Sequence, residues 1–215
     1  AAYQQAAALE PLNPAIYVDW GRAGLVFTDR IMLVANQAQG KDKEQLIEAR
    51  RQSLEQITPL FQRAIEVKPD FAPAHFLLAQ TAIRLGNIDV AIASVENAKL
   101  AAPFDIGVAF QLGLLYYQKD NLARSQQEFE RAVTINENYS NARYFLGLIY
   151  DRKGEKDKAI AEFERIVKLN PDNQEIQRIA ANLKEGKPAL AGIVPPAPPP
   201  EQRKETPVKE QERSK

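Results

Sequence analysis

Apolar and small residues recur at the same positions every 34 residues over much of the chain. Segments that start at His75, Ala109 and Arg143 carry them three, four and seven positions after the start, and again sixteen, twenty and twenty-three positions after it. Each set falls on one face of an α-helix, so each segment predicts two helices that pack through these faces. The positions are Leu78, Ala79, Ala82, Ala91, Val95 and Ala98, then Leu112, Gly113, Tyr116, Ser125, Phe129 and Ala132, then Leu146, Gly147, Tyr150, Ala159, Phe163 and Ile166.

Small and large residues complement each other within each predicted pair. The first helix carries a small residue at one fixed position, which is Ala79, Gly113 or Gly147. A small side chain there lets the second helix approach closely, and Phe129 or Phe163 on that second helix fills the remaining volume. The three segments therefore predict three helix pairs of one design.

This pattern resembles the tetratricopeptide repeat family, whose repeat is 34 residues long. The resemblance implies an all-α fold, a tetratricopeptide-type α-solenoid of stacked antiparallel helix pairs with a C-terminal capping helix. It also implies a non-catalytic protein that holds other polypeptides, as members of this family do.

An earlier repeat carries the same signature with a longer gap between its two halves. Its first helix is expected to pack through Trp20, Ala23, Gly24 and Phe27, and its second through Phe61 and Ala64. The gap exceeds that of a regular repeat by about twenty residues, so this pair should form an elongated hairpin. Such a hairpin either packs only on itself, which is the favoured interpretation, or docks a partner. The run from Ile31 to Val34 keeps docking open, because four adjacent apolar residues cover more than one helix face.

The expected organisation follows from these repeats and from the composition that surrounds them. After Gly186 the chain has few residues to bury, and it is rich in proline and then in alternating charges, which is typical of disorder. The chain also starts inside a repeat, which suggests a longer protein. The expected segments are 1–14 as the end of a preceding repeat, 15–69 as the elongated first repeat, 70–103, 104–137 and 138–171 as the second, third and fourth repeats, 172–186 as the capping helix, and 187–215 as a disordered tail.

Composition excludes several classes of function. Basic and acidic residues balance at 28 each, so no net field attracts nucleic acid. The chain has no cysteine and one histidine, and it shows neither a nucleophile constellation nor a phosphate loop. We therefore predict no enzymatic activity, no metal and no cofactor. No stretch reaches the ~18 apolar residues of a membrane span.

The predicted partner-binding groove lies on the inner side of the first helices. In this family the inner wall comes from positions one, five and eight residues after each start, which face away from the packing stripe. Aromatic residues share one such phase in three units, and this favours an apolar partner segment over an acidic one. The alternative is that they pack between neighbouring first helices. The candidate residues are Phe76, Gln80, Ile83, Arg84, Phe110, Leu114, Tyr117, Tyr144, Leu148, Asp151 and Arg152.

Two functions from different classes fit the sequence. The first is a protein–protein interaction scaffold or adaptor that binds a peptide or helix in an apolar, aromatic-lined groove. The second is the soluble C-terminal appendage of a larger, membrane-embedded bacterial protein. We expect a soluble chain, in the bacterial cytoplasm or as the extracytoplasmic part of a membrane protein, with a protein or peptide partner whose identity the sequence leaves open.

Overall fold

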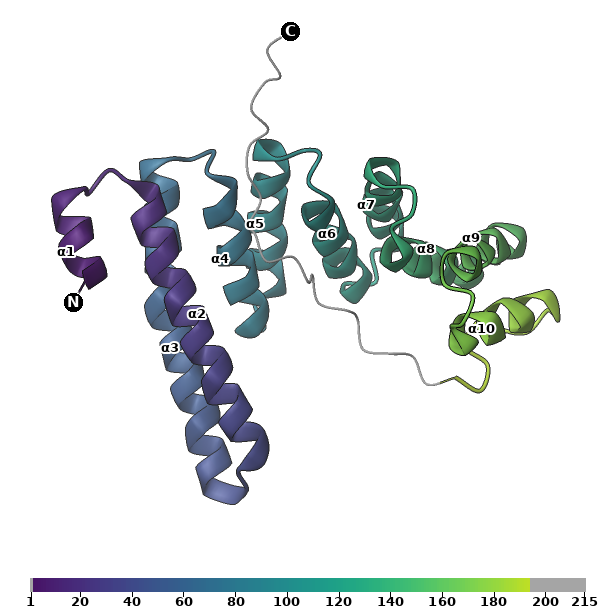
Figure 1. Cartoon of the computed structure of the whole chain (residues 1–215), viewed down its shortest axis with the longest axis horizontal. Coiled ribbons are helices and arrows are strands. Elements are labelled where there is room, and N and C mark those ends of the chain that lie inside the picture. Colours follow the sequence, from purple (N-terminus) through teal and green to yellow (C-terminus); the bar gives the residue numbers. More distant parts are fainter. Residues whose placement is uncertain (1, 194–215) are drawn as a thin grey trace, which may run out of the picture. The chain divides into compact units, whose positions relative to one another are not determined.

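The computed structural model describes residues 2–193, and every regular element in that range is an α-helix (Figure 1). This confirms the predicted all-α fold class. The helices form two compact units, of which unit 1 ends at Pro103 and unit 2 begins at Phe104. Unit 1 contains α1 (Ala2–Leu9), α2 (Pro14–Gln37), α3 (Gly40–Val67), α4 (Ala72–Arg84) and α5 (Ile88–Ala101). Unit 2 contains α6 (Ile106–Gln118), α7 (Leu122–Ile135), α8 (Ser140–Arg152), α9 (Lys156–Leu169) and α10 (Gln174–Lys184).

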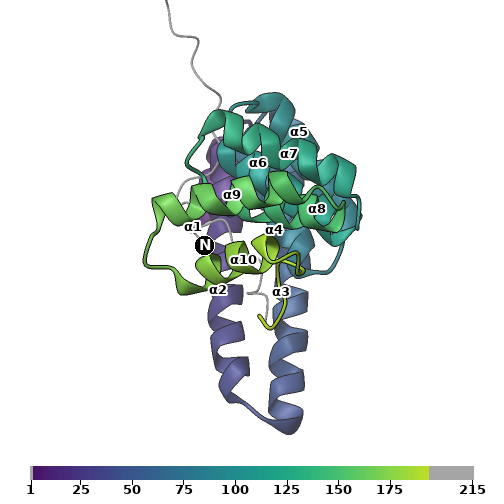
Figure 2. The ribbon, with the colours of Figure 1, turned by 90° about the vertical axis from the view of Figure 1, so that its right-hand side faces the viewer.

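The first repeat of unit 1 is an elongated hairpin of α2 and α3. Asn13 caps α2 by accepting a hydrogen bond from the Ala15 backbone N–H, and Pro14 occupies the first turn, where its missing N–H costs nothing. The distal parts of α2 and α3 extend well past α4 and α5 (Figure 1), and a short turn joins the two legs at the tip (Figure 2). The core of the proximal part contains Tyr17, Val18, Leu25, Leu54, Ile57, Phe61 and Ala64.

The register of this first repeat differs from the expected one by three residues. A Cβ atom placed on Gly21 would lie 2.4 Å from the Phe61 ring, as one on Gly147 would from the Phe163 ring. Gly21 is therefore the small residue of this repeat, and the assignment to Gly24 is wrong. Phe27, expected to pack inside the pair, is 58% exposed. The regular spacing from this glycine to the aromatic residue is 16 residues, but here it is 40, so the insertion is longer than the sequence pattern suggested.

Gly24 and Ile57 face each other across the first helix pair. In the repeats of unit 2 the first helix carries the large residue and the second the small one, whereas here the order is reversed. Three residues after the small residue, the other repeats of this type carry Tyr116 or Tyr150, whereas the first repeat carries Gly24. The facing position on the second helix is small in those repeats and is Ile57 here. A Cβ on Gly24 would lie 2.5 Å from Ile57 Cγ2. The isoleucine side chain therefore fills the space that a tyrosine side chain fills in the repeats of unit 2.

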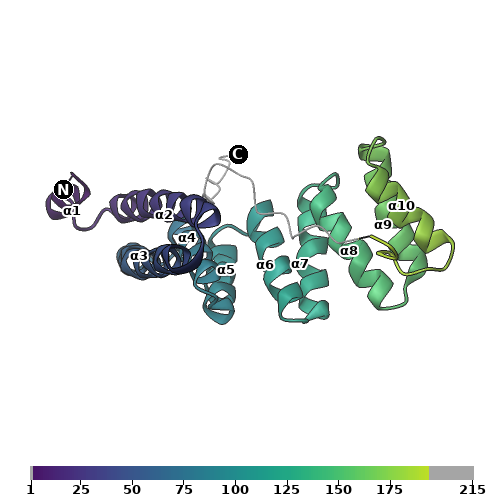
Figure 3. The ribbon, with the colours of Figure 1, turned by 90° about the horizontal axis from the view of Figure 1, so that it is seen from below.

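Unit 2 contains two regular helix pairs and a final helix (Figure 3). Side-chain oxygens cap three of its helices: Asp105 accepts from Val108 N–H, Asn121 from Arg124 N–H and Asn173 from Ile176 N–H. Phe129 packs against Gly113 and Phe163 against Gly147, as the spacing predicted. Ile176, Ile179, Ala180 and Leu183 of α10 are buried in the same core.

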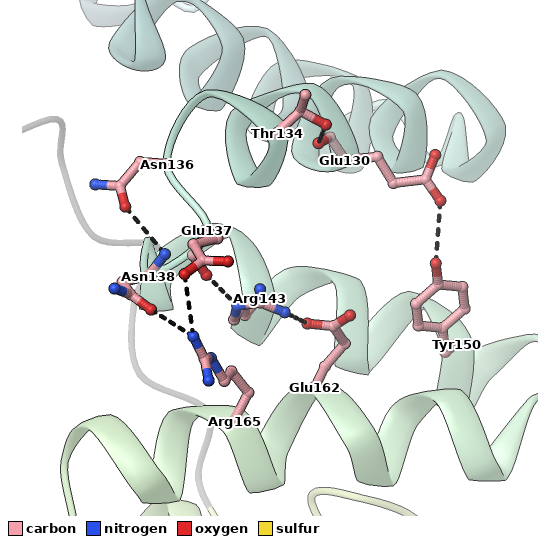
Figure 4. Close-up of polar contacts among 9 residues, drawn as sticks. All are labelled: Glu130, Thr134, Asn136, Glu137, Asn138, Arg143, Tyr150, Glu162 and Arg165. Carbon is pink, nitrogen blue, oxygen red and sulfur yellow. Dashed lines mark hydrogen bonds and ion pairs between the residues drawn. The ribbon is translucent and has the colours of Figure 1, made fainter.

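Polar side chains link the helices of unit 2 both within one helix pair and between neighbouring pairs (Figure 4). Arg143 Nη1 lies 2.6 Å from Glu162 Oε2, and both side chains are mostly buried. The Tyr150 hydroxyl donates a hydrogen bond of 3.0 Å to Glu130, and Arg165 donates one of 2.9 Å to Asn138. Burial, followed by the hydrogen bond to Glu130, raises the pKa of Tyr150 to about 12.

The segment after α10 packs on unit 2, contrary to the expected tail boundary at residue 187. Ala189 is fully buried, and Leu190 and Ile193 pack against the hydrophobic core. The Asn182 amide donates to the carbonyl oxygens of Ala189 (3.1 Å) and Ala191 (2.9 Å). Three apolar residues and a buried amide therefore hold residues 187–193, and the predicted disorder is wrong for them. The rest of the predicted tail, 194–215, lies outside the described residues.

Candidate functional site

Four of the predicted groove residues are buried in the hydrophobic core. Phe110 is 0% exposed and Phe76 is 2% exposed, while Leu114 and Leu148 are 5% and 7% exposed. A side chain without accessible surface cannot contact a partner unless the fold opens. The expectation that these four residues line an open groove is therefore corrected.

The rings around Phe110 give the physical reason. Its ring centroid lies 5.3 Å from that of Tyr139, 5.8 Å from Phe129 and 6.1 Å from Phe145. Phe145 belongs to α8, the first helix of the next repeat, so this neighbouring helix covers the face that a single helix would leave open. Phe110 is thus part of an aromatic cluster within unit 2.

The inner positions of unit 1 include two partly exposed polar side chains, those of Gln80 and Arg84. Gln80, Ile83 and Arg84 of α4 are each partly exposed. Arg84 Nη2 lies 3.3 Å from Asp29 Oδ2 on α2, and its other nitrogen donates to Gln80. This arginine therefore links the elongated hairpin to the following helix.

The inner positions of unit 2 present a tyrosine and an arginine that contact each other. The Tyr117 ring meets Phe145 edge-on at 5.3 Å, and the Arg152 guanidinium lies over its face, 5.8 Å from the ring centroid. Arg152 Nη2 also pairs with Asp120 Oδ1 at 2.7 Å, and both side chains are largely exposed. This pairing raises the pKa of Arg152 above its usual value, first through the hydrogen bond to Asp120, so the guanidinium stays charged.

Tyr144 also packs against Phe145, and its hydroxyl is unsatisfied. Its ring meets Phe145 at 5.5 Å and Phe163 at 5.7 Å, both edge-on. The hydroxyl oxygen is buried and has no hydrogen-bond partner in the described part of the chain. Burial raises the pKa of Tyr144 to about 12, and the nearby Glu175 and Tyr117 add to this effect. The phenol is therefore a neutral donor at physiological pH.

Asp151 is engaged by the chain itself and does not line an open groove. Its Oδ2 atom accepts a 2.8 Å hydrogen bond from the Ala189 backbone N–H, and its other oxygen pairs with Lys156. The segment after α10 therefore occupies this predicted site. The repeat pattern carries no sign of this contact, because the two partners lie 38 residues apart.

Sequence reasoning missed Asp120, which completes the Arg152 pair. Asp120 stands in the turn after α6 with φ of 56°, a conformation that Asp and Asn tolerate better than most residues. A signal existed: Arg84 and Arg152 occupy the same repeat position, and each pairs with an aspartate from an earlier helix or turn. Two arginines in phase could have prompted a search for acidic partners.

Two properties of residues 2–193 bear on the excluded functions. Among these residues, no group of three or more histidine, cysteine, aspartate or glutamate side chains is arranged to hold a metal ion. None of the described helices combines the length and apolar character that a membrane crossing requires.

Comparison with known proteins identifies the family. A model of the tetratricopeptide repeat matches residues 59–106 and 110–174. The solved structure of YrrB, a TPR protein with an unusual peptide-binding site, is 18% identical, and the match covers 89% of this chain and 88% of YrrB with a TM-score of 0.64. MamA (41-end) from Desulfovibrio magneticus RS-1 is 17% identical over 80% of this chain and 84% of its own, with a TM-score of 0.60.

A third solved structure is the first TPR of Spaghetti (RPAP3) bound to the HSP90 peptide SRMEEVD. It is 19% identical over 54% of this chain and 91% of its own, with a TM-score of 0.50. No curated protein matches the chain. At these identities the solved structures show a shared fold. Because the family model covers more than half of the sequence, and the glycine–phenylalanine contacts repeat as the pattern requires, the chain belongs to the tetratricopeptide repeat family.

Proposed function

We propose that the chain is a non-catalytic protein–protein interaction scaffold that binds a peptide or helix through inner positions of its repeats. In unit 2 the binding side chains are Tyr117, Tyr144, Arg152 and Asp120, which we call the Tyr117 surface. The observation that carries the proposal is the exposed Arg152 guanidinium, which lies over the ring of the partly exposed Tyr117 and pairs with Asp120.

The chemistry of the Tyr117 surface suits a polypeptide ligand. Tyr117 supplies an aromatic face, and the guanidinium of Arg152 is held against it by Asp120. Tyrosine and arginine are among the residue types that most often dominate binding energy in protein interfaces.

The family supports the general role. Tetratricopeptide repeat proteins mediate protein–protein interactions, and two of the solved structures above concern peptide binding. The Tyr117 surface differs from the inner walls of members that grip a carboxylate with several basic residues, since Asp120 already neutralises its one guanidinium. We therefore propose that the ligand segment is apolar and not acidic.

The test uses the full chain with a photoreactive phenylalanine analogue at position 117. Proteins that crosslink at this position are identified by mass spectrometry, purified, and titrated against the variants Tyr117→Ala and Arg152→Ala. If the proposal holds, each variant weakens binding by ~2 kcal/mol, roughly thirtyfold, as the truncation of an interface anchor does. Unfolding free energy should change by about 1 kcal/mol or less, since both side chains are partly or largely exposed.

Gln127 provides the matched control, because it is exposed on α7, the second helix of its pair. A photoreactive residue at position 127 should not capture the same protein, and Gln127→Ala should leave its affinity unchanged. Equal capture at both positions, or wild-type affinity of Tyr117→Ala, would refute this use of the surface.

A further inference from the structure

The outer face of α2 carries an apolar stripe that unit 1 leaves uncovered. Val26, Phe27, Leu33 and Val34 are 52%, 58%, 66% and 55% exposed. With successive residues about 100° apart, these side chains and those of Ala23 and Arg30 fall within about 120° of one another. We call these six residues the α2 stripe. The residues that face α3, such as Gly21, Leu25, Thr28 and Ala35, lie on the opposite side of the helix and are buried.

The neighbouring helix shows what a solvent-facing surface of this hairpin looks like. On α3, Arg51 pairs with Glu48 at 2.6 Å and with Glu55 at 2.5 Å, and all three side chains are about half exposed. Hydrogen bonds from Arg51 and then Gln52 lower the pKa of Glu48 to about 2, so this face stays ionised. The same hairpin therefore has one charged outer face and one apolar outer face. Exposed apolar side chains that gather in this way mark interaction sites.

The spacing of the α2 stripe fits one straight helical partner. Val26 and Leu33 are seven residues apart, as are Phe27 and Val34, which is the repeat of a two-helix coiled coil. From Ala23 to Val34 the stripe extends for about 17 Å along the helix axis. It therefore offers roughly one and a half heptads, enough for a short amphipathic helix to pack alongside.

Arg30 determines the charge that the partner needs. It lies between the two apolar pairs, is exposed, and forms no ion pair or hydrogen bond within the described part of the chain. A second copy of α2 packed antiparallel about this point would bring the two Arg30 guanidinium groups together, and like charges in an interface oppose binding. A partner with a carboxylate at this point would gain a charge-assisted hydrogen bond instead.

We propose that the α2 stripe is a second protein-binding site, whose partner is an amphipathic helix of another protein with an acidic residue at the centre of its apolar stripe. This site is separate from the Tyr117 surface, because it lies in unit 1 and uses none of the same residues. Under this proposal the elongated hairpin docks a partner and does not pack only on itself. The run of apolar residues from Ile31 to Val34 had left this interpretation open.

The probes are two fluorescently labelled synthetic peptides of about three heptads, with leucine at the two core positions of each heptad. They differ at one central position next to the core, which is glutamate in one peptide and lysine in the other. Fluorescence anisotropy with the full chain should show that the glutamate peptide binds at least about tenfold more tightly. Arg30→Glu should reverse this preference.

Variants of the full chain locate the binding of the glutamate peptide. Phe27→Ser/Val34→Ser should weaken this binding at least about tenfold, whereas Gln56→Ser, an exposed change on α3, should have no effect. Tyr117→Ala should also have no effect, so failure of the Tyr117 surface and failure of the stripe are distinguishable. Circular dichroism establishes that each variant keeps the wild-type helical signal.

Three results would overturn the proposal. The first is that the full chain binds the glutamate and lysine peptides with equal affinity. The second is that Phe27→Ser/Val34→Ser leaves the affinity for the glutamate peptide unchanged. The third is a concentration-dependent dimer of the chain in sedimentation that the same double variant abolishes. The last result would assign the stripe to a second copy of this chain.

Discussion

At the scale of single residues, packing depends on matched volumes across each helix pair. Gly21, Gly113 and Gly147 each face a phenylalanine so closely that an added Cβ atom would lie 2.4–2.6 Å from its ring. Ala79 departs from this design, because it is paired with the smaller Val95. Gly24 and Ile57 show the same rule in reverse, since the small residue and the large one have exchanged helices.

This exchange predicts that alanine substitutions at the two positions compensate each other. Gly24→Ala should destabilise the chain by ~1–3 kcal/mol because its Cβ meets Ile57, although Gly→Ala in a helix is otherwise stabilising. Ile57→Ala should cost ~2–5 kcal/mol through the cavity it leaves. In the double variant the new Cβ occupies part of that cavity, so the loss should be smaller than the sum by ~0.5–3 kcal/mol. Urea unfolding of the four proteins measures this coupling, and strict additivity would contradict the exchange.

Tyr150 predicts a dependence of stability on alkaline pH. Its pKa is raised from the ordinary tyrosine value of 10.0 to about 12 in the folded chain, so the folded state favours the protonated phenol. The contribution of the protonated Tyr150 phenol to the unfolding free energy is complete below pH 10, and it is lost as the pH rises toward about 12. The unfolding free energy of the wild type should therefore exceed that of Tyr150→Phe by a margin that narrows between pH 9 and about pH 11. Urea unfolding at several pH values measures the margin, and a constant margin would show that this phenol does not contribute.

At the scale of elements, the sequence predicted the regular helix pairs well and the surfaces between pairs poorly. The 34-residue spacing located the contact of Phe163 with Gly147, because both residues belong to one repeat. Phe110 shares its phase with other aromatic residues, yet Phe145 of the next repeat covers it. The spacing within one helix shows which residues share a face, but a neighbouring helix decides whether that face is open.

The elongated hairpin adds a prediction about local stability. Between Asp29 and Ser53, Ala35 is the one buried residue, whereas the proximal part of the hairpin buries Leu25, Leu54 and Phe61. Helical segments with few buried contacts open at low free-energy cost. Amide hydrogens of residues 31–50 should therefore exchange much faster than those of residues 54–64, as measured by mass spectrometry. Similar protection in both ranges would mean that the distal part is held by contacts beyond those described.

At the scale of the whole molecule, the two units differ in how closely they follow the family pattern. Unit 2 keeps the regular spacing through α9 and closes its core with α10, as expected. Unit 1 lengthens its first repeat by the insertion between Gly21 and Phe61. Spacing could reveal that an insertion exists, but it could not place the register, because an extra helical turn presents a similar set of residues to the partner helix.

The end of unit 2 gives the last prediction, which concerns two truncations of the chain. Removal of residues 187–215 takes away the buried Ala189 and leaves the Asn182 amide without its two carbonyl acceptors. Loss of this buried apolar surface and of the two hydrogen bonds costs ~1–3 kcal/mol, so the melting temperature should fall by at least about 4 °C. Removal of residues 194–215 alone should change it by less than about 2 °C, because the contacts of Ala189, Leu190 and Ile193 remain. Circular dichroism follows both truncated chains, and Trp20 fluorescence reports unit 1 in the same samples. Equal melting temperatures for the two truncations would show that residues 187–193 contribute nothing to stability. The contacts of this segment with unit 2 would then not stabilise the fold.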